Sequence, residues 1–597
     1  MKTKKLMKAS SLCALLLCGA MNVSAQEAIT FDPANFTTPA WTKIVRLSKQ
    51  LEGQNSKKPY SINMTINGDP TTRMAFAWFT NPEVTTGMVQ IVEGKDATDF
   101  TNATVINATS KATSLNYAVD DNELEGIEID TKKDYMSHKA LATGLKPATT
   151  YTYRVGNAEG WSETGTFTTA AESYKDGFSF IYITDTQAEN DFMFNVSQQT
   201  LHTALDEFPE TSFVLCNGDL VETTGTSGNS SEWENEQWFE TMQDIWMNYP
   251  LAVTMGNHDR SQYNNNNNFY WHFNNDTTFN QTSKVPLTMP GTVFSFVHGD
   301  ALFLMLSFED YSKEGLLDEL EKWIRNAVAE HPNVKWRFAS FHKNMFTGSR
   351  SHQSDKDGKI IREKFLPIFN ELHIHFALQG HDHIYEVIGP VTNDKTLVDG
   401  AVEKVETVEP SGVRENMTGK SGGVFNVNKG TLYFLNNSAG VKKYEPRSED
   451  DMIDAFEDHN VENYWGLFSG KFGQTGEPTF SHITVKSDSI FVDTYTVNTA
   501  ANAELFDSFI IINKESGADN VQSDSETNRI KIYFNKNTKQ IVVEGIDAEQ
   551  VDVFSANGAI VNSTSEEAVN ASGLTNGLYI VKAKKGNDNY FGKVMVE

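Results

Sequence analysis

The sequence has few cysteines, few prolines and no long apolar run beyond its first residues. Of its three cysteines in 597 residues, Cys13 and Cys18 lie in an amino-terminal segment that we expect to be removed. The mature chain then keeps only Cys216, which excludes an intramolecular disulfide and indicates a small core residue. No later apolar stretch approaches the ~18 residues needed to span a bilayer, so no transmembrane segment is predicted.

Basic residues are also scarce. The sequence holds 50 lysines and arginines against 79 acidic residues, which gives a formal net charge of −29, and the loss of four lysines with the first segment takes it from −29 to −33. Such a surface repels nucleic-acid backbones, so no binding to them is expected. It also repels phosphate, so positive charge at a phosphate-binding site would have to come largely from metal ions.

The first 25 residues have the pattern of a secretory signal peptide. Lys2, Lys4, Lys5 and Lys8 precede an apolar stretch around residues 12–20, and residues 23–25 supply a small-residue cleavage site. A lipoprotein signal through Cys18 is disfavoured because Leu17 stands where such signals have a small residue. We therefore expect a secreted, periplasmic or cell-surface protein.

Five short polar motifs stand at the ends of apolar runs in the middle of the chain. They are Asp185-Thr186-Gln187, Gly218-Asp219, Gly256-Asn257-His258-Asp259, His342 and Gly380-His381-Asp382-His383. The runs before them, at residues 178–185, 212–219, 251–256, 336–342 and 374–380, are typical of buried strands. Residues 201–208 and 316–327 have helical apolar spacing. This alternation predicts an α/β fold with the motifs beyond the carboxyl ends of its strands.

The residue types of the motifs suit hard or borderline metal ions. Carboxylate and amide oxygens and neutral imidazole nitrogens are present, and thiolates are not. A single bridging carboxylate, Asp219, could hold two ions about 3.5–4 Å apart, the separation used for in-line displacement at phosphorus. The motifs together therefore predict a two-metal site for phosphoester hydrolysis.

Each motif alone has a simpler interpretation. A lone His342 at a strand end is more often a hydrogen-bonded structural histidine, and Gly-Asp or Gly-Asn-His are common in turns. The ordered set of five favours metal binding over these alternatives. Other polar or aromatic residues are weaker candidates: Asp382 is expected to point into the scaffold, and the tryptophans Trp233, Trp238 and Trp246 to pack a helix or line a rim. Three basic residues could contact substrate phosphate, although lone basic residues are usually solvated: Arg260, Lys343 and Arg350.

The order of the motifs resembles the calcineurin-like metallophosphoesterase superfamily, and within it the purple acid phosphatases, over about residues 55–497. The resemblance implies an αββα sandwich as the catalytic domain, at residues 176–497. It also implies one metal held by Asp185, Asp219 and His383, and a second held by Asp219, Asn257, His342 and His381. His258 would bind the phosphoryl group and help protonate the leaving oxygen, and Asp259 would orient its ring.

Two positions depart from the resemblance. Purple acid phosphatases have a tyrosine three residues after the bridging aspartate, and this chain has Glu222 there. Many relatives outside the purple group have a histidine two residues after the first aspartate, and this chain has Gln187 there. Either side chain could complete the first coordination sphere. The metals are left open among iron, zinc and manganese, and a purple iron–tyrosinate centre is not expected.

Two all-β domains are expected to flank the catalytic domain. Residues 55–170 resemble a fibronectin-III-like sandwich of the kind found at the amino terminus of plant-type purple acid phosphatases, and a short linker indicates that it packs on the core. Residues 525–597 resemble the carboxy-terminal sorting domain of type IX secretion, which would make the secretion machinery a partner. The alternative for this tail is an immunoglobulin-like domain without a sorting role. Two polar stretches are predicted insertions, at residues 225–235 with 264–268 and at residues 389–423.

These observations predict a secreted dinuclear metal-dependent phosphoesterase that hydrolyses small phosphate esters by attack of metal-bound water. An acid-phosphatase-like phosphomonoesterase is the preferred form. A phosphodiesterase or nucleotide hydrolase on the same site is the alternative within enzymes. A surface binding protein with an inactive catalytic core is the alternative of another class, and the complete set of candidate ligands argues against it.

Overall fold

The computed structural model describes the chain from residue 56 to residue 596 with gaps. The described residues are 56–116, 132–222, 232–259, 268–281, 290–353, 355–398, 402–403, 423–454, 461, 464–514, 531–536, 538–544, 546–555, 559–566, 568–585 and 588–596. The expected signal peptide lies outside them, as do most residues of the predicted insertions. None of the helices in the described part is long and apolar enough to cross a membrane.

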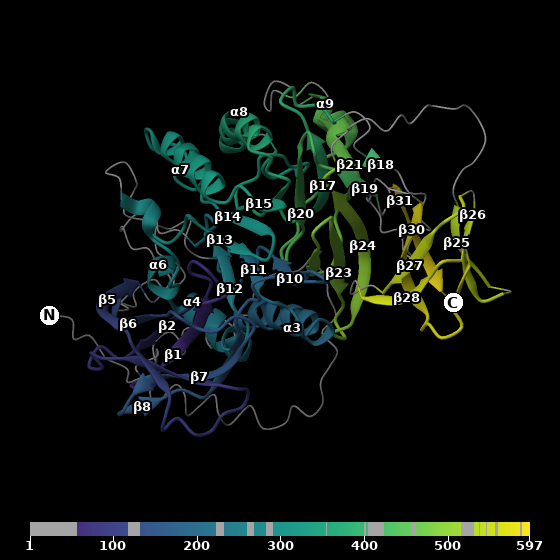
Figure 1. The fold of residues 1–597 in the computed structure, drawn as a ribbon. Coiled ribbons are helices and arrows are strands. Elements are labelled where there is room, and N and C mark those ends of the chain that lie inside the picture. Colours follow the sequence, from purple (N-terminus) through teal and green to yellow (C-terminus); the bar gives the residue numbers. More distant parts are fainter. Residues whose placement is uncertain are drawn as a thin grey trace, which may run out of the picture.

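The amino-terminal part is a sandwich of two β-sheets (Figure 1). One face consists of β1 (Tyr60–Thr65), β2 (Met74–Thr80), β6 (Lys132–Ala142) and β5 (Thr109–Asn116). The other consists of β4 (Thr104–Asn107), β3 (Met88–Glu93), β7 (Thr150–Asn157), β8 (Gly160–Trp161) and β9 (Gly165–Thr168). Phe76 and Tyr153 meet between the sheets with ring centroids 4.7 Å apart. β3 alternates buried with partly exposed residues, whereas β1 and β2 are buried along their whole length, so the inner faces of the two sheets pack together.

The central part is built from two further sheets packed face to face. The first contains β10 (Phe178–Ile183), β11 (Val214–Asn217), β12 (Leu251–Thr254), β22 (Thr479–Val485), β23 (Ser489–Val497), β24 (Ala503–Ile512), β19 (Val424–Asn426) and β18 (Val402–Glu403). The second contains β13 (Phe294–His298), β14 (Ala301–Met305), β15 (Trp336–Phe341), β16 (Phe376–Gln379), β20 (Thr431–Asn436), β17 (Tyr385–Val391) and β21 (Phe468–Gly473). Rings such as Phe180, Phe303 and Phe338 fill the space between them.

Helices cover the outer face of each central sheet. On the first sheet lie α3 (Asp191–Glu207), α4 (Glu232–Thr241) and α5 (Gln243–Trp246), and on the second lie α7 (Leu316–Glu330) and α8 (Lys356–Glu371). Shorter helices occur in the connections: α6 (Asn268–His272), η2 (Thr278–Gln281), α9 (Glu449–Asp454) and η3 (Trp465–Leu467). The layers are therefore helix, sheet, sheet, helix, which confirms the predicted αββα class and the strands predicted before the five motifs.

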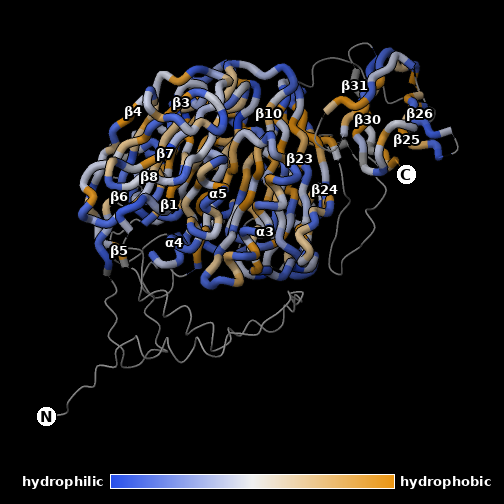
Figure 2. Tube along the Cα trace, turned by 90° about the horizontal axis from the view of Figure 1, so that it is seen from below, coloured by the Kyte–Doolittle hydropathy of each residue, from blue (hydrophilic) through white to orange (hydrophobic). Residues whose placement is uncertain are grey.

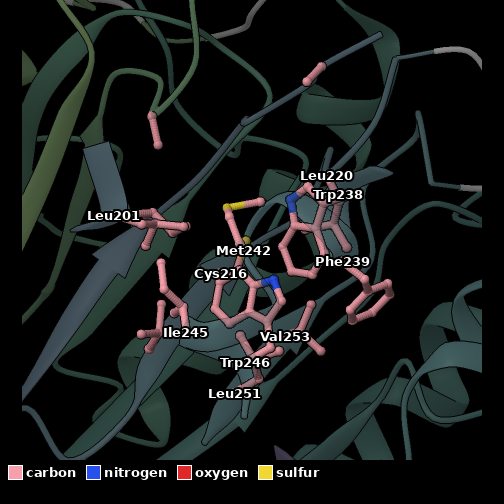
Figure 3. Close-up of a cluster of buried hydrophobic side chains, with 14 of the residues drawn as sticks. Leu201, Cys216, Leu220, Trp238, Phe239, Met242, Ile245, Trp246, Leu251 and Val253 are labelled. Carbon is pink, nitrogen blue, oxygen red and sulfur yellow. The ribbon is translucent and has the colours of Figure 1, made fainter. Parts of the chain in front are cut away.

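A cluster of large apolar side chains backs the strands that carry the motifs (Figure 3). Trp238 and Trp246 stack with ring centroids 4.5 Å apart, and Trp233 is buried in the same cluster. Cys216 is fully buried there too. The three tryptophans therefore pack helices α4 and α5 onto the sheet, and the cysteine is a core residue, as the sequence predicts.

The sandwich and the central domain share one continuous sheet. Strand β1 pairs in parallel with β12, and the backbone N–H of Ile66 donates to the Leu251 carbonyl at 3.0 Å. The Gln243 side chain adds two hydrogen bonds to the Ile62 backbone, at 3.0 and 2.6 Å. These contacts join the two domains through backbone pairing, so one sheet of the sandwich is an extension of the central sheet.

The carboxy-terminal part forms its own small β domain. One sheet holds β25 (Lys531–Asn535), β26 (Gln540–Glu544) and β29 (Ala568–Asn570), and the other holds β28 (Ile560–Thr564), β27 (Gln550–Phe554), β30 (Gly577–Lys585) and β31 (Asp588–Val596). Figure 2 shows this domain as a lobe beside β23 and β24. Phe554 and Ile580 pack against Phe491 of the central sheet, with the two phenylalanine rings 6.2 Å apart.

Candidate metal centre

The ends of the strands bring the predicted site residues to one edge of the two central sheets. Strands β10, β11 and β12 are parallel neighbours in one sheet, and β15 and β16 are parallel neighbours in the other. The residues that follow them are, in chain order, Asp185, Gln187, Asp219, Asn257, His258, Asp259, His342, His381 and His383. Contacts between the sheets show that these loops meet, since His342 Nδ1 lies 2.9 Å from the Asn217 carbonyl oxygen. Polar side chains therefore converge at the carboxyl edge, where α/β sheets bind ligands.

The backbone of this edge is held in unusual conformations. Asp185, Gln187, Asp219 and His381 all have positive φ, at 54, 35, 48 and 73°. Such left-handed residues cost of order 1–3 kcal/mol each when they are not glycine, and they cluster at functional sites. Gly256 makes the close approach possible, because a Cβ there would lie 2.2 Å from Asp219 Oδ1.

Three side chains form a compact group of candidate metal ligands. Asp219, His342 and His381 are buried, and one ligand atom of each lies within 4.8 Å of the others. His342 Nε2 lies 3.1 Å from Asp219 Oδ2 and 3.2 Å from Asn257 Oδ1. The other ring nitrogen, Nδ1, faces the Asn217 carbonyl, an arrangement that fixes the ring and leaves Nε2 as the ligating atom.

The electrostatics of this group favour a positive charge. Burial alone would lower the pKa of His342, but the carboxylate of Asp219 outweighs it and raises the pKa to about 10. Burial likewise opposes ionisation of Asp219, while the charges of His342 and His258 hold the pKa of its carboxyl below the usual range. The Asp219 carboxylate thus attracts positive charge, and the oxygen and imidazole donors around it suit a metal ion.

Buried polar atoms without partners point to the same centre. His381 Nε2 and Gln187 Oε1 have no hydrogen-bond partner among the described residues. Burial, followed by the charge of His352, holds the pKa of His381 well below its usual value, so its imidazole is neutral and able to ligate. Because buried polar atoms are nearly always satisfied, these two atoms fit ligands of a bound ion.

Asp185 and His383 lie together on the other side of the group. His383 Nε2 is 3.4 Å from Asp185 Oδ1, and its ring stacks on Tyr444 with centroids 4.3 Å apart. The Thr184 hydroxyl donates to Asp185 Oδ2 at 2.6 Å, and the His381 backbone N–H donates to the same carboxylate at 3.1 and 3.2 Å. These contacts hold the carboxylate beside His383, one of the residues expected with it.

Glu222 differs from the other expected ligands. Its carboxylate forms an ion pair with Lys442, and burial raises the pKa of this carboxyl. Gln187 Oε1, in contrast, is buried and has no hydrogen-bond partner among the described residues. The geometry therefore favours Gln187 over Glu222 as the residue that completes the first coordination sphere.

The ring of His258 is held by a neighbour that the sequence did not predict. His258 Nδ1 lies 2.5 Å from the Glu222 carbonyl oxygen, and its backbone N–H donates to Asp219 Oδ1 at 2.8 Å. The Asp259 carboxylate instead accepts the backbone N–H groups of Leu220 and Gly256, both at 2.8 Å. Asp259 therefore ties two motif loops together, which corrects the expectation that it orients the His258 ring directly.

His352 is a site residue that the sequence reasoning missed. Its ring stacks on His381 with centroids 3.9 Å apart, and its Nδ1 lies 2.8 Å from Asp355 Oδ2. The ligand atoms of His352, Asp355 and His381 form the second group within 4.8 Å. A second histidine in the loop after His342 was the available signal.

The other predicted polar residues are paired with neighbouring side chains, buried, or outside the described chain. Lys343 is paired internally with Asp357 at 2.6 Å, and Arg350 is paired with Asp451 at 2.6 Å. Arg260 lies outside the described residues. Asp382 is fully buried, burial raises the pKa of its carboxyl, and neither carboxylate oxygen has a hydrogen-bond partner among the described residues, so its expected place in the scaffold stays a prediction.

Comparisons with known proteins identify three domains. Residues 59–169 match the purple acid phosphatase N-terminal domain, residues 178–385 match the calcineurin-like phosphoesterases, and residues 526–597 match a secretion-system C-terminal sorting domain. The chain is 24% identical over 315 residues to acid phosphatase type 7 of Danio rerio, covering 48% of this chain and 64% of that protein. It is 23% identical over 161 residues to probable purple acid phosphatase 20 of Arabidopsis thaliana, covering 26% and 36%. It thus spans less than two thirds of each relative.

Solved structures show the same fold. Purple acid phosphatase PPD1 from yellow lupin (Lupinus luteus) seeds superposes with a TM-score of 0.55 at 15% identity, over 79% of this chain and 77% of that one. PhoD superposes with a TM-score of 0.50 at 12% identity, over 79% and 94%. The chain therefore has the fold of these phosphatases, and it contains a segment that matches the calcineurin-like phosphoesterases, preceded by a match to the purple acid phosphatase N-terminal domain and followed by a match to a secretion-system sorting domain.

Proposed function

We propose that the mature chain is a secreted two-metal phosphoesterase that acts on small phosphate esters, with monoesters preferred. The observation that carries this proposal is the convergence of Asp219, His342 and His381, with ligand atoms within 4.8 Å and with His381 Nε2 buried and unpartnered among the described residues. The preference for monoesters rests on the acid phosphatases among its relatives.

The donors divide into two sets that share Asp219. Asp185, Gln187, Asp219 and His383 would hold one ion, and Asp219, Asn257, His342 and His381 the other. Iron, zinc and manganese all accept such oxygen and imidazole ligands. Bound ions would polarise the phosphoryl oxygens and lower the pKa of a water molecule from 15.7 toward about 7.

The chain's own residues would position the substrate and move the proton. His258 Nδ1 donates to the Glu222 carbonyl, which fixes the ring and leaves Nε2 as the atom to contact the phosphoryl group and protonate the leaving oxygen. His352, held by Asp355 and stacked on His381, supplies a second imidazole at the same edge for the phosphoryl oxygens. Lys442 neutralises Glu222 beside them.

Export is the second part of the proposal. The sorting domain at residues 526–597 supports delivery to a secretion system, with the protein released or kept at the cell surface. The amino-terminal signal peptide expected from residues 1–25 would take the chain across the first membrane. Mature protein found only in the cytoplasm of the native cells would contradict this part.

Hydrolysis assays on the purified mature chain test the function. We expect about two metal ions per chain and faster turnover of an aryl phosphomonoester than of the matching aryl diester. Faster turnover of the diester would identify the protein as a phosphodiesterase instead of a phosphomonoesterase. A metal-loaded protein that cleaves neither ester would favour the non-catalytic surface protein instead.

A further inference from the structure

A polar cavity lies between the amino-terminal sandwich and the segment that contains α6. It has a volume of about 480 Å³, which falls in the usual range of ligand pockets. One wall is formed by β5 and β6, and the other by Tyr270, Trp271 and the residues that follow them. Figure 1 shows α6 close to β5 and β6. No residue of the candidate metal centre lines it.

Three basic side chains of the sandwich line this cavity: Arg73, Lys111 and Lys139. Lys111 pairs in register with Ser137 and Thr109 with Lys139, so the two lysines are diagonal neighbours on one face of the sheet. Among the described residues, none of the three forms an ion pair with a carboxylate. Burial, followed by the charge of Lys111, lowers the pKa of Lys139 to about 7. Lys139 is therefore only partly charged near neutral pH, and the positive charge at this cavity comes from Arg73 and Lys111, with Asp276 as an acidic residue in the same lining.

The opposite wall offers hydrogen-bond acceptors and apolar surface. Asn275 is 4% exposed, its Nδ2 donates to the Gly291 carbonyl at 2.9 Å, and its Oδ1 has no partner among the described residues. An unpaired amide oxygen requires a donor such as a hydroxyl, which a simple anion lacks. Trp271 adds a partly exposed ring to the same wall.

The aromatic wall is not shaped to stack a nucleobase. Lys139 Nζ lies 4.0 Å from the centroid of the Tyr270 ring, so that face of the ring is occupied. The rings of Tyr270 and Trp271 stand at 72° to each other, which gives no parallel slot. A ligand with anionic groups, hydroxyl donors and a small apolar face would complement the two cations, the Asn275 amide oxygen and the Trp271 ring, and its hydroxyl groups could also donate to the Asp276 carboxylate.

We propose that this cavity binds an acidic saccharide, with Arg73 and Lys111 pairing its anionic groups and Asn275 accepting from a hydroxyl. The anionic groups could be uronic carboxylates or sulfate esters, because both pair with these cations. Binding there would attach the secreted protein to an acidic glycan through its sandwich, while the metal centre stays free.

Calorimetric titration of the metal-loaded mature protein tests this site. The ligands are a uronic acid tetrasaccharide, a sulfated tetrasaccharide, a neutral tetrasaccharide, a nucleoside monophosphate and inorganic sulfate. We expect at least one acidic saccharide to bind and the neutral one not to bind. The doubly substituted variant Arg73→Ala with Lys111→Ala should bind it at least about tenfold more weakly, since each contact to a charged group is lost.

The matched control removes two exposed lysines elsewhere. Lys95 and Lys175 are exposed and do not line the cavity, so Lys95→Ala with Lys175→Ala changes the net charge equally. This control should keep wild-type affinity, and all three proteins should hydrolyse an aryl phosphate equally. The proposal is overturned if no acidic saccharide binds, if the neutral saccharide, nucleotide or sulfate binds as tightly, or if the control loses affinity as much as the double variant.

Discussion

Replacing His258 with alanine should separate catalysis from metal binding. The ring contributes to neither group of candidate metal ligands, and its Nδ1 contacts the Glu222 carbonyl. The backbone N–H that donates to Asp219 Oδ1 at 2.8 Å survives the substitution. The ligands should therefore stay in place while the proton donor is lost.

The expected loss is large in rate and small in metal content. A positioned acid or base contributes about 10²–10⁴ in rate, which corresponds to about 2.7–5.4 kcal/mol of activation free energy. The loss should be greater for an alkyl phosphate than for a nitrophenyl phosphate, because the better leaving group needs less protonation. A general loss of structure would lower both rates equally.

The assay combines kcat/KM for both esters with elemental analysis of the purified proteins. His202→Ala is the matched control, since this partly exposed histidine lies on α3 and pairs with Asp244 at 3.3 Å. The control should keep wild-type rates. The reasoning fails if His258→Ala loses a metal ion, if its rate falls less than about tenfold, or if both esters slow by the same factor.

Three further predictions concern the ligands and the domains. Gln187→Leu should lower metal content by elemental analysis while Glu222→Gln should not, because Gln187 Oε1 is buried and unpartnered among the described residues whereas the Glu222 carboxylate is paired with Lys442; the reverse result would make Glu222 the ligand. Deleting residues 26–170 should give insoluble protein on sedimentation, since it removes the β1–β12 pairing, and soluble active protein would refute this. Deleting residues 527–597 should leave turnover near that of the full chain and lower the thermal midpoint slightly, because Phe491 loses its contact with Phe554; an inactive product would contradict it.

The layered fold could be predicted because its signals are local. Each strand before a motif is a short apolar run, and α3 and α7 show clear helical spacing, so element type and order follow from periodicity. The parallel pairing of β1 with β12 could not be predicted. It depends on a contact between Thr65 and Leu251, and no local pattern of the sequence specifies a partner so distant along the chain.

For the candidate site, the identity of the residues could be predicted from the sequence, but their detailed contacts could not. The five motifs named the residues that converge, because strand ends of parallel sheets meet at one edge. The detailed partners were not predictable, since the ion pair between Lys442 and Glu222 joins residues separated by 220 positions. The hydrogen bonds of Asp259 and the stacking of His352 on His381 likewise depend on side-chain geometry that spacing does not contain.

Metal content and turnover of Asp219→Ala, measured beside the wild type, test the central claim most directly. Asp219 is the one residue shared by both proposed metal sets, and it is buried between His342 and His258. We predict about two metal ions and hydrolysis of an aryl phosphate for the wild type, and loss of both for the variant. A variant that keeps its metal ions and turnover, or a metal-loaded wild type that cleaves no phosphate ester, would contradict a two-metal phosphoesterase.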